Sequence, residues 1–469
     1  MDNIKFGTDG WRAITDKDFN EVNLNRVVDA IALYLKEHFN NDMSIPVLIG
    51  YDPRYKADVF SMQAAERLAG YGFNVKYSER VLPTPVLAYG AININAPAIM
   101  FTASHNPANY LGVKLIPEYA GPATTEITNE IIANLDKPVQ FEKPLVKKLV
   151  GYDFFPNYTF KLKEIIDFDK IAKLKKHIIY DGLYSASIGY LDYFLDFAGL
   201  DYETLHMTHD PDFGGLMPDP KPENLAELID KVKLTNNAIG VATDGDADRY
   251  GIINELGEFV TPNEIMAILF VYLKEKRGFK GGIIKTVAGS LMLDKLAQLY
   301  NVPLIETAVG FKHVGQAMRE NQFVIGGEES GGLSIQNYIP EKDGIIAILL
   351  LLEALADSKS QSLVELQEKL YKKVQVKFFN DRIDMPLQSV EKAHSIINEL
   401  KNCSNDYFEK FLIVNKDFKD GVKIYFDDKK SCILVRSSGT EPLLRFYIET
   451  DSVQKMDELK LLINKFLEF

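Results

Sequence analysis

Apolar and polar positions repeat in the same order three times along most of the chain. Each copy starts with a short β-branched run, continues into a segment with apolar residues three and four positions apart, and ends in a second apolar run. The flanking runs are IPVLIGYDPR with FNVKY, KHIIYDG with DYETLHM, and GGIIKTVAGS with VPLIETA. Strand, helix and strand in this order are typical of βαβ units, which predicts mostly parallel sheets.

The spacing of the three copies indicates separate domains. Ile49, Ile179 and Ile284 hold equivalent places and are 130 and 105 residues apart, which is the size of a small domain and not of a solenoid repeat. We therefore expect three related α/β domains, with soft boundaries, over residues 1–150, 151–256 and 257–373.

The last part of the chain has a different pattern. From about Val374 the runs VQVKFF, VKIYF, SCILV and LLRFYIE resemble strands. The closing segment carries apolar residues on one helical face: Val453, Met456, Leu459, Ile463 and Phe466. We expect an antiparallel α+β domain over residues 374–469.

Each α/β copy also has a later apolar strand that runs straight into a polar loop. AIMF leads into TASHNP (the serine loop), and AIGVA leads into TDGDADR (the acid loop). FVI leads into GGEESGG, whose acidic side chains suit the vicinal hydroxyls of a sugar or polyol (the sugar loop). In open α/β sheets, ligands bind beyond the carboxyl ends of the strands. The fold class expected is three α/β domains with mixed, mostly parallel sheets plus the antiparallel domain, around a central cleft.

Composition narrows the classes of function. The net charge of −13 argues against binding nucleic acid or anionic membrane by bulk electrostatics. Two cysteines in 469 residues do not form a disulfide framework or a metal-binding spacing. The longest apolar run, Ile345 to Leu352, is too short to cross a bilayer and is interpreted as a buried helix. We expect a cytoplasmic protein.

The serine loop places Ser104 after a buried strand. A serine hydroxyl needs a base, a metal or a positive environment to act as a nucleophile. His105 adjoins it, but neighbouring residues rarely form a catalytic pair, and the chain has no GxSxG elbow there, which disfavours a serine hydrolase. Taken alone, such a serine is more often a turn residue.

The acid loop offers Asp244, Asp246 and Asp248 at alternate positions. Carboxylates in a tight turn can converge on one hard divalent cation such as Mg²⁺. An EF-hand is disfavoured because Arg249 stands where that loop needs glycine and because a strand precedes it. An aspartyl phosphatase using Asp244 and Asp246 and a solvated acidic turn remain alternatives, although Arg249 suits a phosphoryl oxygen.

Two further loops have the composition of ligand sites. Glu328 and Ser330 in the sugar loop can bond vicinal hydroxyls. RSSGTEP (the phosphate loop, residues 436–442) combines Arg436 with hydroxyls and backbone N–H groups that suit a phosphate. Arg12 in GTDGWR and Lys312 in GFKHVG lie beside glycines. Taken alone, GGEESGG is better interpreted as an ordinary glycine-rich turn, and RSSGTEP alone is a weak signal.

FGTDGWR, TASHNP, DGDADR, GEESGG and RSSGTEP, in this order across the whole chain, resemble the α-D-phosphohexomutase family. PDPKPENL is also similar to a segment of that family. The resemblance implies a heart-shaped, four-domain fold with the active site in a central cleft. It also implies transfer of phosphate between carbon-1 and carbon-6 of a hexose through a phosphoserine, with Mg²⁺ as cofactor and a hexose 1,6-bisphosphate as intermediate and activator.

The resemblance assigns roles to matching positions. Ser104 would carry the phosphoryl group and contact Mg²⁺ together with Asp244, Asp246 and Asp248. The catalytic residues expected beside Ser104 are Lys114, Arg12, His105 and Arg249. The substrate-binding residues expected are Glu328, Ser330, Lys312, Lys285, Arg436, Ser437, Ser438, Gly439 and Thr440.

Lys114 is the expected proton-exchange group. It lies in the alternating run LGVKLI on the face opposite Leu111, Val113 and Leu115. If nearby cations lower its pKa, it can exchange a proton with the reacting sugar hydroxyl. An exposed surface lysine is the alternative.

The sugar is expected to be glucose, so the function expected is phosphoglucomutase. Glu328 and Glu329 before Ser330 resemble phosphoglucomutases, whereas phosphoglucosamine mutases usually have glutamine at the position of Glu329. A phosphomannomutase or a dual-specificity enzyme is the alternative. Two departures bear on specificity: Gly332 replaces a common histidine, and Leu111 replaces the asparagine of YNG.

Outside this enzyme class, a sugar-phosphate sensor or an aspartyl phosphatase remains. The expected partners are small hexose phosphates, with no nucleic acid and no membrane, and the protein is expected to be a monomer or a homodimer.

Overall fold

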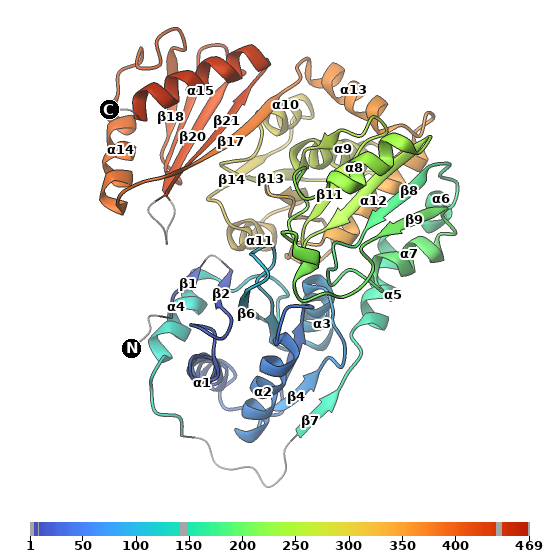
Figure 1. Cartoon of the computed structure of the whole chain (residues 1–469), viewed down its shortest axis with the longest axis vertical. Coiled ribbons are helices and arrows are strands. Elements are labelled where there is room, and N and C mark those ends of the chain that lie inside the picture. Colours follow the sequence, from blue (N-terminus) through green and yellow to red (C-terminus); the bar gives the residue numbers. More distant parts are fainter. Residues whose placement is uncertain (1–3, 8, 141–147, 438–442, 468–469) are drawn as a thin grey trace.

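The three expected βαβ units are present in the computed structural model, which describes residues 4–7, 9–140, 148–437 and 443–467 (Figure 1). Their strands pair in parallel within each unit, so the prediction is confirmed. The units are β3 (Pro46–Tyr51), α2 (Ala57–Gly70) and β4 (Asn74–Tyr77); β8 (His177–Asp181), α7 (Leu191–Phe197) and β9 (Tyr202–Leu205); and β13 (Gly282–Thr286), α10 (Leu291–Leu299) and β14 (Leu304–Thr307).

The later apolar strands are also where the sequence predicts them. β5 (Ala98–Phe101), β10 (Ala238–Thr243) and β15 (Phe323–Gly327) pair in parallel with the first strand of their unit. Each is followed by an antiparallel return strand: β6 (Tyr110–Ile116), β11 (Tyr250–Ile253) and β16 (Leu333–Ile335). The serine, acid and sugar loops therefore join a parallel strand to an antiparallel one in all three sheets.

The first sheet has the order β1-β2-β6-β5-β3-β4-β7. Its edge strand β7 pairs in parallel with β4, so the expected boundary at residue 150 falls inside a strand of this sheet. The other elements of this domain are β1 (Phe6–Gly7), β2 (Gly10–Ile14), α1 (Glu21–His38), α3 (Thr84–Ile94), α4 (Thr125–Asn134) and β7 (Lys148–Gly151).

The second and third sheets have the orders β12-β11-β10-β8-β9 and β14-β13-β15-β16. The further elements of the second domain are α5 (Phe155–Ile165), α6 (Phe168–Ile171), η1 (Phe213–Gly215), α8 (Ala226–Leu234) and β12 (Phe259–Val260). Those of the third are α9 (Pro262–Glu275), α11 (Phe311–Glu320), α12 (Gly344–Asp357) and α13 (Leu363–Val374).

The long apolar run forms α12, which is buried from Gly344 to Leu355. This confirms the buried helix. The Asp343 side chain caps it by accepting hydrogen bonds from Ile345 N and Ile346 N, which satisfies donors that have no partner within the helix. Within the described ranges, none of the helices combines the length and apolarity that a bilayer-spanning segment needs.

The C-terminal domain contains an antiparallel sheet with the order β17-β21-β20-β19-β18. It lies at the top left of Figure 1, beside the third domain. Its elements are β17 (Phe379–Pro386), α14 (Val390–Asn402), β18 (Ile413–Asp417), β19 (Val422–Phe426), β20 (Cys432–Ser437), β21 (Leu443–Thr450) and α15 (Val453–Leu467).

One strand of this domain differs from the prediction. VQVKFF is mostly not a strand, because Val374 ends α13 and β17 begins only at Phe379. β17 alternates between half-buried and exposed positions and carries Asp381, Arg382 and Asp384. The apolar pattern of β17 is therefore weak. The more apolar run VQVKFF, directly before it, predicts a strand that the structure does not contain at most of those positions.

Candidate active site

The serine loop follows β5 and holds Ser104 in an uncommon backbone conformation. Ser104 is 1% exposed and has φ of 51°, in the left-handed region that residues other than glycine seldom adopt. Its N–H donates to Thr102 Oγ1 at 2.8 Å, and its Oγ lies 3.3 Å from His105 Nδ1. Strain of this kind is concentrated at functional sites, where the surroundings impose it.

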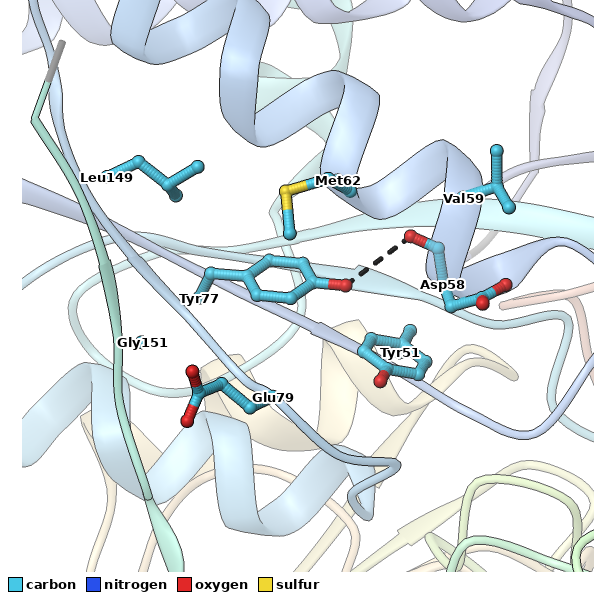
Figure 2. Close-up of a pocket in the computed structure, with 8 residues that line it drawn as sticks. All are labelled: Tyr51, Asp58, Val59, Met62, Tyr77, Glu79, Leu149 and Gly151. Carbon is cyan, nitrogen blue, oxygen red and sulfur yellow. Dashed lines mark hydrogen bonds between the residues drawn. The ribbon is translucent and has the colours of Figure 1, made fainter.

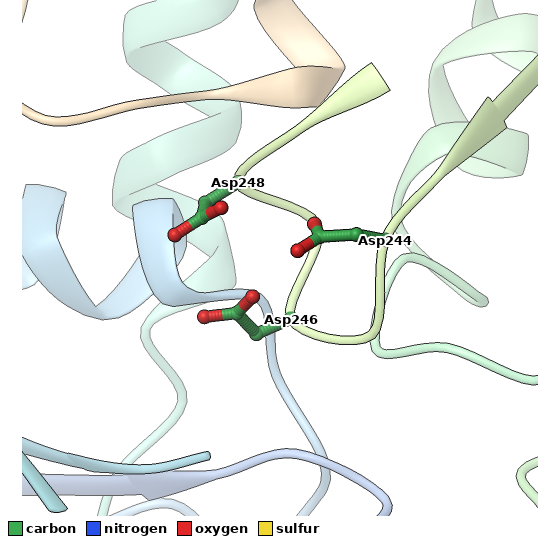
Figure 3. A group of neighbouring side chains, drawn as sticks. All are labelled: Asp244, Asp246 and Asp248. Atoms are coloured by element: carbon green, nitrogen blue, oxygen red, sulfur yellow. The ribbon is translucent and has the colours of Figure 1, made fainter. Parts of the chain in front are cut away.

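The acid loop lies directly against this serine. Ser104 Oγ donates to Asp244 Oδ2 at 2.7 Å. Asp244, Asp246 and Asp248 are fully buried, and each offers a carboxylate oxygen within 4.8 Å of the others (Figure 3). The Oδ1 atoms of Asp246 and Asp248 are buried without a hydrogen-bond partner among the described residues. Mg²⁺ prefers hard oxygen ligands, and these buried carboxylates have oxygen atoms that are available to bind it.

Burial and mutual repulsion perturb these acids. Burial, reinforced by Asp248 and Asp246, raises the pKa of Asp244 well above its usual value. Burial acts in the same direction on the pKa of Asp246, but Lys114, Thr84 and Lys342 together outweigh it, and the net shift is downward. The burial of the three side chains excludes the solvated acidic turn, and β10 before the loop distinguishes it from an EF-hand.

Lys114, on β6, joins the first domain to the acid loop. Its Nζ lies 2.9 Å from Asp246 Oδ2, 3.1 Å from Asp248 Oδ2 and 2.9 Å from Asp9 Oδ2. It is 2% exposed, so it is not a surface lysine. The expected lowering of its pKa by cations is wrong: burial lowers the pKa, but the carboxylates around it dominate and raise it well above its usual value.

Arg12 and Arg249 lie beside the cluster formed by Ser104, the acid-loop carboxylates and Lys114. Arg12 Nη1 donates to Asn106 Oδ1 in the serine loop at 2.7 Å. Arg249 Nε is buried without a hydrogen-bond partner among the described residues, 4.0 Å from Asp248 Oδ1. Burial, with Arg249 and Arg12 adding to it, holds the pKa of His105 well below its usual value, so this imidazole is neutral at pH 7.

The sugar loop packs on the second domain. Glu328 Oε1 accepts a hydrogen bond from Gly310 N at 3.0 Å, and burial followed by Glu329 raises the pKa of Glu328 to about 7. A Cβ added to Gly331 would lie 3.1 Å from Tyr250 O, so this loop touches the start of β11. Ser330 is half-buried, as is Lys312 in the first turn of α11.

Lys342 is a member of the site that the sequence motifs did not reveal. Its Nζ lies 3.3 Å from Asp248 Oδ2, 3.8 Å from Asp9 Oδ2 and 3.0 Å from Glu341 Oε1. A Cβ added to Gly332 would lie 2.4 Å from Lys342 Cδ. The glycine that replaces the common histidine thus leaves room for a lysine. The available signal was the charged segment PEKDG directly before the long apolar run Ile345 to Leu352.

Lys285 occupies a different place from the other predicted residues. Its fully buried Nζ pairs with Asp294 and lies 3.5 Å from Glu306 Oε2. Glu306 also pairs with Lys423 of the fourth domain at 3.0 Å. The described contacts of Lys285 therefore place it where the third and fourth domains meet.

The phosphate loop lies partly outside the described residues, which end at Ser437 and resume at Leu443. Arg436 Nη2 pairs with Asp420 Oδ2 at 2.8 Å, and Asp420 accepts a hydrogen bond from Val309 N of the third domain at 2.9 Å. Arg436 Nε is buried without a hydrogen-bond partner in the described part of the chain. The predicted contacts of Ser438, Gly439 and Thr440 fall outside this part.

A hollow of about 720 Å³ lies elsewhere in the first domain (Figure 2). Tyr77 lies at its centre and donates from Oη to Asp58 O at 3.4 Å. Its lining residues are Tyr51, Asp58, Val59, Met62, Tyr77, Glu79, Leu149 and Gly151. It contains none of the residues predicted for the site.

Comparisons with known proteins agree with this geometry. Models of the four phosphoglucomutase/phosphomannomutase domains match the chain: α/β/α domain I at residues 3–141, domain II at 156–257, domain III at 261–374 and the C-terminal domain at 396–465.

Similar proteins match over nearly the whole chain. A phosphoglucomutase/phosphomannomutase of Thermococcus kodakarensis is 29% identical, covering 99% of this chain and 98% of its own. A Methanothermobacter thermautotrophicus protein, provisionally named a phosphoglucosamine mutase, is 31% identical over 87% of both. The crystal structure of a Thermus thermophilus protein, provisionally named a phosphomannomutase, has a TM-score of 0.86 at 28% identity, covering 99% of each chain. The chain is therefore an enzyme of the α-D-phosphohexomutase family, whose members are isomerases that transfer a phosphoryl group.

Proposed function

We propose that this enzyme is a phosphoglucomutase that interconverts glucose 1-phosphate and glucose 6-phosphate through phosphoserine at Ser104 and glucose 1,6-bisphosphate. One observation carries the proposal. Ser104 Oγ lies 2.7 Å from Asp244 Oδ2 in a buried group that also contains Asp246, Asp248 and Lys114. A hydroxyl in such a position can both accept and release a phosphoryl group.

In the transfer step, the free hydroxyl oxygen of the sugar attacks the phosphorus on Ser104. The new sugar P–O bond forms while the bond from phosphorus to Ser104 Oγ breaks, and the hydroxyl proton ends, in net terms, on Ser104 Oγ. Lys114, which the carboxylates around it hold as an ammonium, neutralises charge on the phosphoryl oxygens. Lys342, which shares Asp248 Oδ2 with Lys114, and Arg249, which lies near Asp248 Oδ1, add further positive charge. Alignment and charge neutralisation are the main sources of rate in phosphoryl transfer.

Asp244, Asp246 and Asp248 would hold Mg²⁺, with a phosphoryl oxygen of phosphoserine 104 beside them. When bound, the ion supplies Lewis-acid stabilisation of the charge on the transferring group. Its removal tests this part of the proposal. EDTA is expected to abolish turnover, and excess Mg²⁺ to restore it. Undiminished turnover after thorough chelation would contradict the metal assignment.

The bisphosphate must turn around before it returns its other phosphoryl group, so the sugar binds in two orientations. Glu328 and Ser330 suit the 3- and 4-hydroxyls, which take similar places in both. Arg12, His105 and Lys312 orient the substrate, and Arg436 with Ser437 and the rest of the phosphate loop binds the phosphate that is not reacting. Arg436 Nε, which is buried and has no hydrogen-bond partner among the residues that the structure describes, supports that role.

The preference for glucose rests on Glu329, which accepts a hydrogen bond from Thr286 Oγ1 at 2.9 Å. The similar proteins carry the names of several sugars, so phosphomannomutase or dual activity is the second candidate. Parallel kcat/KM values for glucose, mannose and glucosamine 1-phosphates distinguish these. A mannose value equal to or above that for glucose would replace the first proposal by the second.

Ser104→Ala tests whether Ser104 carries the phosphoryl group. We predict that it abolishes mutase turnover, because the phosphoryl group has no residue to occupy, while Ser61→Ala in the same domain retains it. Labelled phosphate should be recovered on serine. Near-normal turnover of Ser104→Ala, or label on an aspartate, would favour the aspartyl phosphatase chemistry instead.

A further inference from the structure

Arg54 lies at the end of the run IPVLIGYDPR, outside the loops assigned to the site, and its side chain binds the serine loop. It is 2% exposed, and its guanidinium donates to four carbonyl oxygens. Nη2 donates to Ser104 O at 2.6 Å and Asn106 O at 2.7 Å, and Nη1 donates to Pro107 O at 2.7 Å and Tyr110 O at 3.0 Å. A guanidinium offers its donors in a rigid plane, so these four bonds fix the loop and the start of its return strand together.

A second series of hydrogen bonds connects Arg54 to the backbone N–H of Ser104. Arg54 Nε donates to Asp52 Oδ2 at 3.2 Å, and Thr102 Oγ1 donates to the same oxygen at 2.6 Å. Thr102 Oγ1 in turn accepts from Ser104 N at 2.8 Å. Arg54 thus holds the carbonyl of Ser104 directly and its N–H through two side chains, which accounts for the left-handed backbone of this residue.

The same guanidinium faces the second domain. Its Cζ lies 5.0 Å from the ring centroid of Phe213 in η1, at a distance typical of a cation–π contact. A Cβ added to Gly245 in the acid loop would lie 2.6 Å from Ser104 O and 3.5 Å from the Phe213 ring. The guanidinium, the serine carbonyl and the acid loop therefore pack against one another without space between them.

From these contacts we infer that Arg54 is a positioning residue for phosphoryl transfer, holding Ser104 Oγ against the acid loop with Phe213 as its support. The inference rests on the proposed function. Arg54 donates to loop carbonyls, and Glu328 and Ser330, the residues proposed to bind the sugar hydroxyls, lie in the third domain. Its loss should therefore slow the transfer without weakening the binding of sugar phosphate. A displacement of about 1 Å at a reacting atom can cost about 10²-fold in rate.

Arg54→Lys in the full-length enzyme tests this, because lysine keeps the charge but cannot reach four carbonyls. The measurements are kcat and KM for glucose 1-phosphate, and the rate at which glucose 1,6-bisphosphate phosphorylates Ser104. We expect kcat and the phosphorylation rate to fall by about 10²-fold, with KM within about threefold of wild type. Arg67→Lys is the matched control: Arg67 lies in the same domain and pairs with Asp29 at 2.5 Å. It should leave both quantities unchanged.

Phe213→Leu is a second variant that keeps the Asp52–Arg54 pair intact and decides the matter if Arg54→Lys does not fold. It should lower kcat by about fivefold to tenfold at unchanged KM. A kcat within twofold of wild type in the folded variants, or a loss carried mainly by KM, would overturn the inference. A wild-type enzyme that is never phosphorylated at Ser104 would instead refute the proposed function.

Discussion

Gly332 and Lys342 act as a pair at the residue scale. The glycine leaves the space that the lysine side chain fills, because a Cβ there would lie 2.4 Å from Lys342 Cδ. We predict that Gly332→Ala displaces Lys342 Nζ from Asp248 and lowers kcat by roughly 10- to 10²-fold. Steady-state kinetics with glucose 1-phosphate measures the effect.

Gly70→Ala is the control for this substitution. A Cβ at Gly70 would meet nothing within 4 Å, so turnover should not change. Equal kcat values for the two variants would show that Lys342 tolerates displacement and does not assist the reaction.

The motifs identified residues by type, but they did not reveal how those residues are charged or supported. Ser104 and the three aspartates could be selected because a strand runs straight into each loop. Arg54 could not, because it ends the run IPVLIGYDPR, which was interpreted only as a strand, and the sole signal for Lys342 was the charged segment PEKDG before α12. The direction of the pKa shift of Lys114 could not be predicted from the sequence either, because Asp9 and Asp246 come close to this lysine only in the folded chain.

The N-terminus of α12 is the element that carries Lys342 into the site. Asp343 accepts hydrogen bonds from Ile345 N, Ile346 N, Tyr158 Oη and Tyr338 Oη at 2.7–3.0 Å. We predict that Asp343→Ala lowers the free energy of unfolding by roughly 3–5 kcal/mol, since it removes a cap and leaves buried donors without a partner. The shift of the first urea transition measures it.

Ser362→Ala is the matched control, because Ser362 caps α13 by accepting one hydrogen bond, from Glu365 N. It should cost about 1 kcal/mol. A shift for Asp343→Ala no larger than that of Ser362→Ala would contradict the role of the buried hydrogen bonds.

Elements with strong periodicity were predicted well, and weakly patterned ones were not. α12 is apolar on every side and could be recognised as buried. β18 and β17 could not be, because each carries exposed polar residues along an edge of the fourth sheet. Edge strands satisfy only one side of their hydrogen-bonding pattern and tolerate such residues.

At the scale of the whole molecule, the fourth domain supplies Arg436. Because phosphate binding from a separate domain helps to close the site against water, we predict that Arg436→Ala raises KM for glucose 1-phosphate by at least about tenfold and speeds hydrolysis of phosphoserine. Lys430→Ala, which removes only a pair with Asp451 at 3.3 Å, should change neither. Unchanged kinetics in Arg436→Ala would remove the fourth domain from the mechanism.

Hydrophobic periodicity predicted the α/β units but not how the domains meet. The resemblance implied one shared site, and contacts such as Ser104 with Asp244 and Lys342 with Asp9 link three domains there. Lys285 shows what matching positions one by one leaves out. The resemblance assigns it to the substrate, which stays a prediction, and its amine pairs with Asp294 and faces Glu306 at the contact with the fourth domain.

The central claim is that Ser104 is the carrier of the phosphoryl group. Intact-protein mass spectrometry with peptide mapping, after incubation with glucose 1,6-bisphosphate and Mg²⁺, tests it most directly. We predict a single added phosphoryl group on Ser104 that disappears when glucose 1-phosphate is supplied, as the bisphosphate forms. Absence of the adduct, its location on another residue, or a phosphoserine that the sugar phosphate cannot discharge would contradict the account.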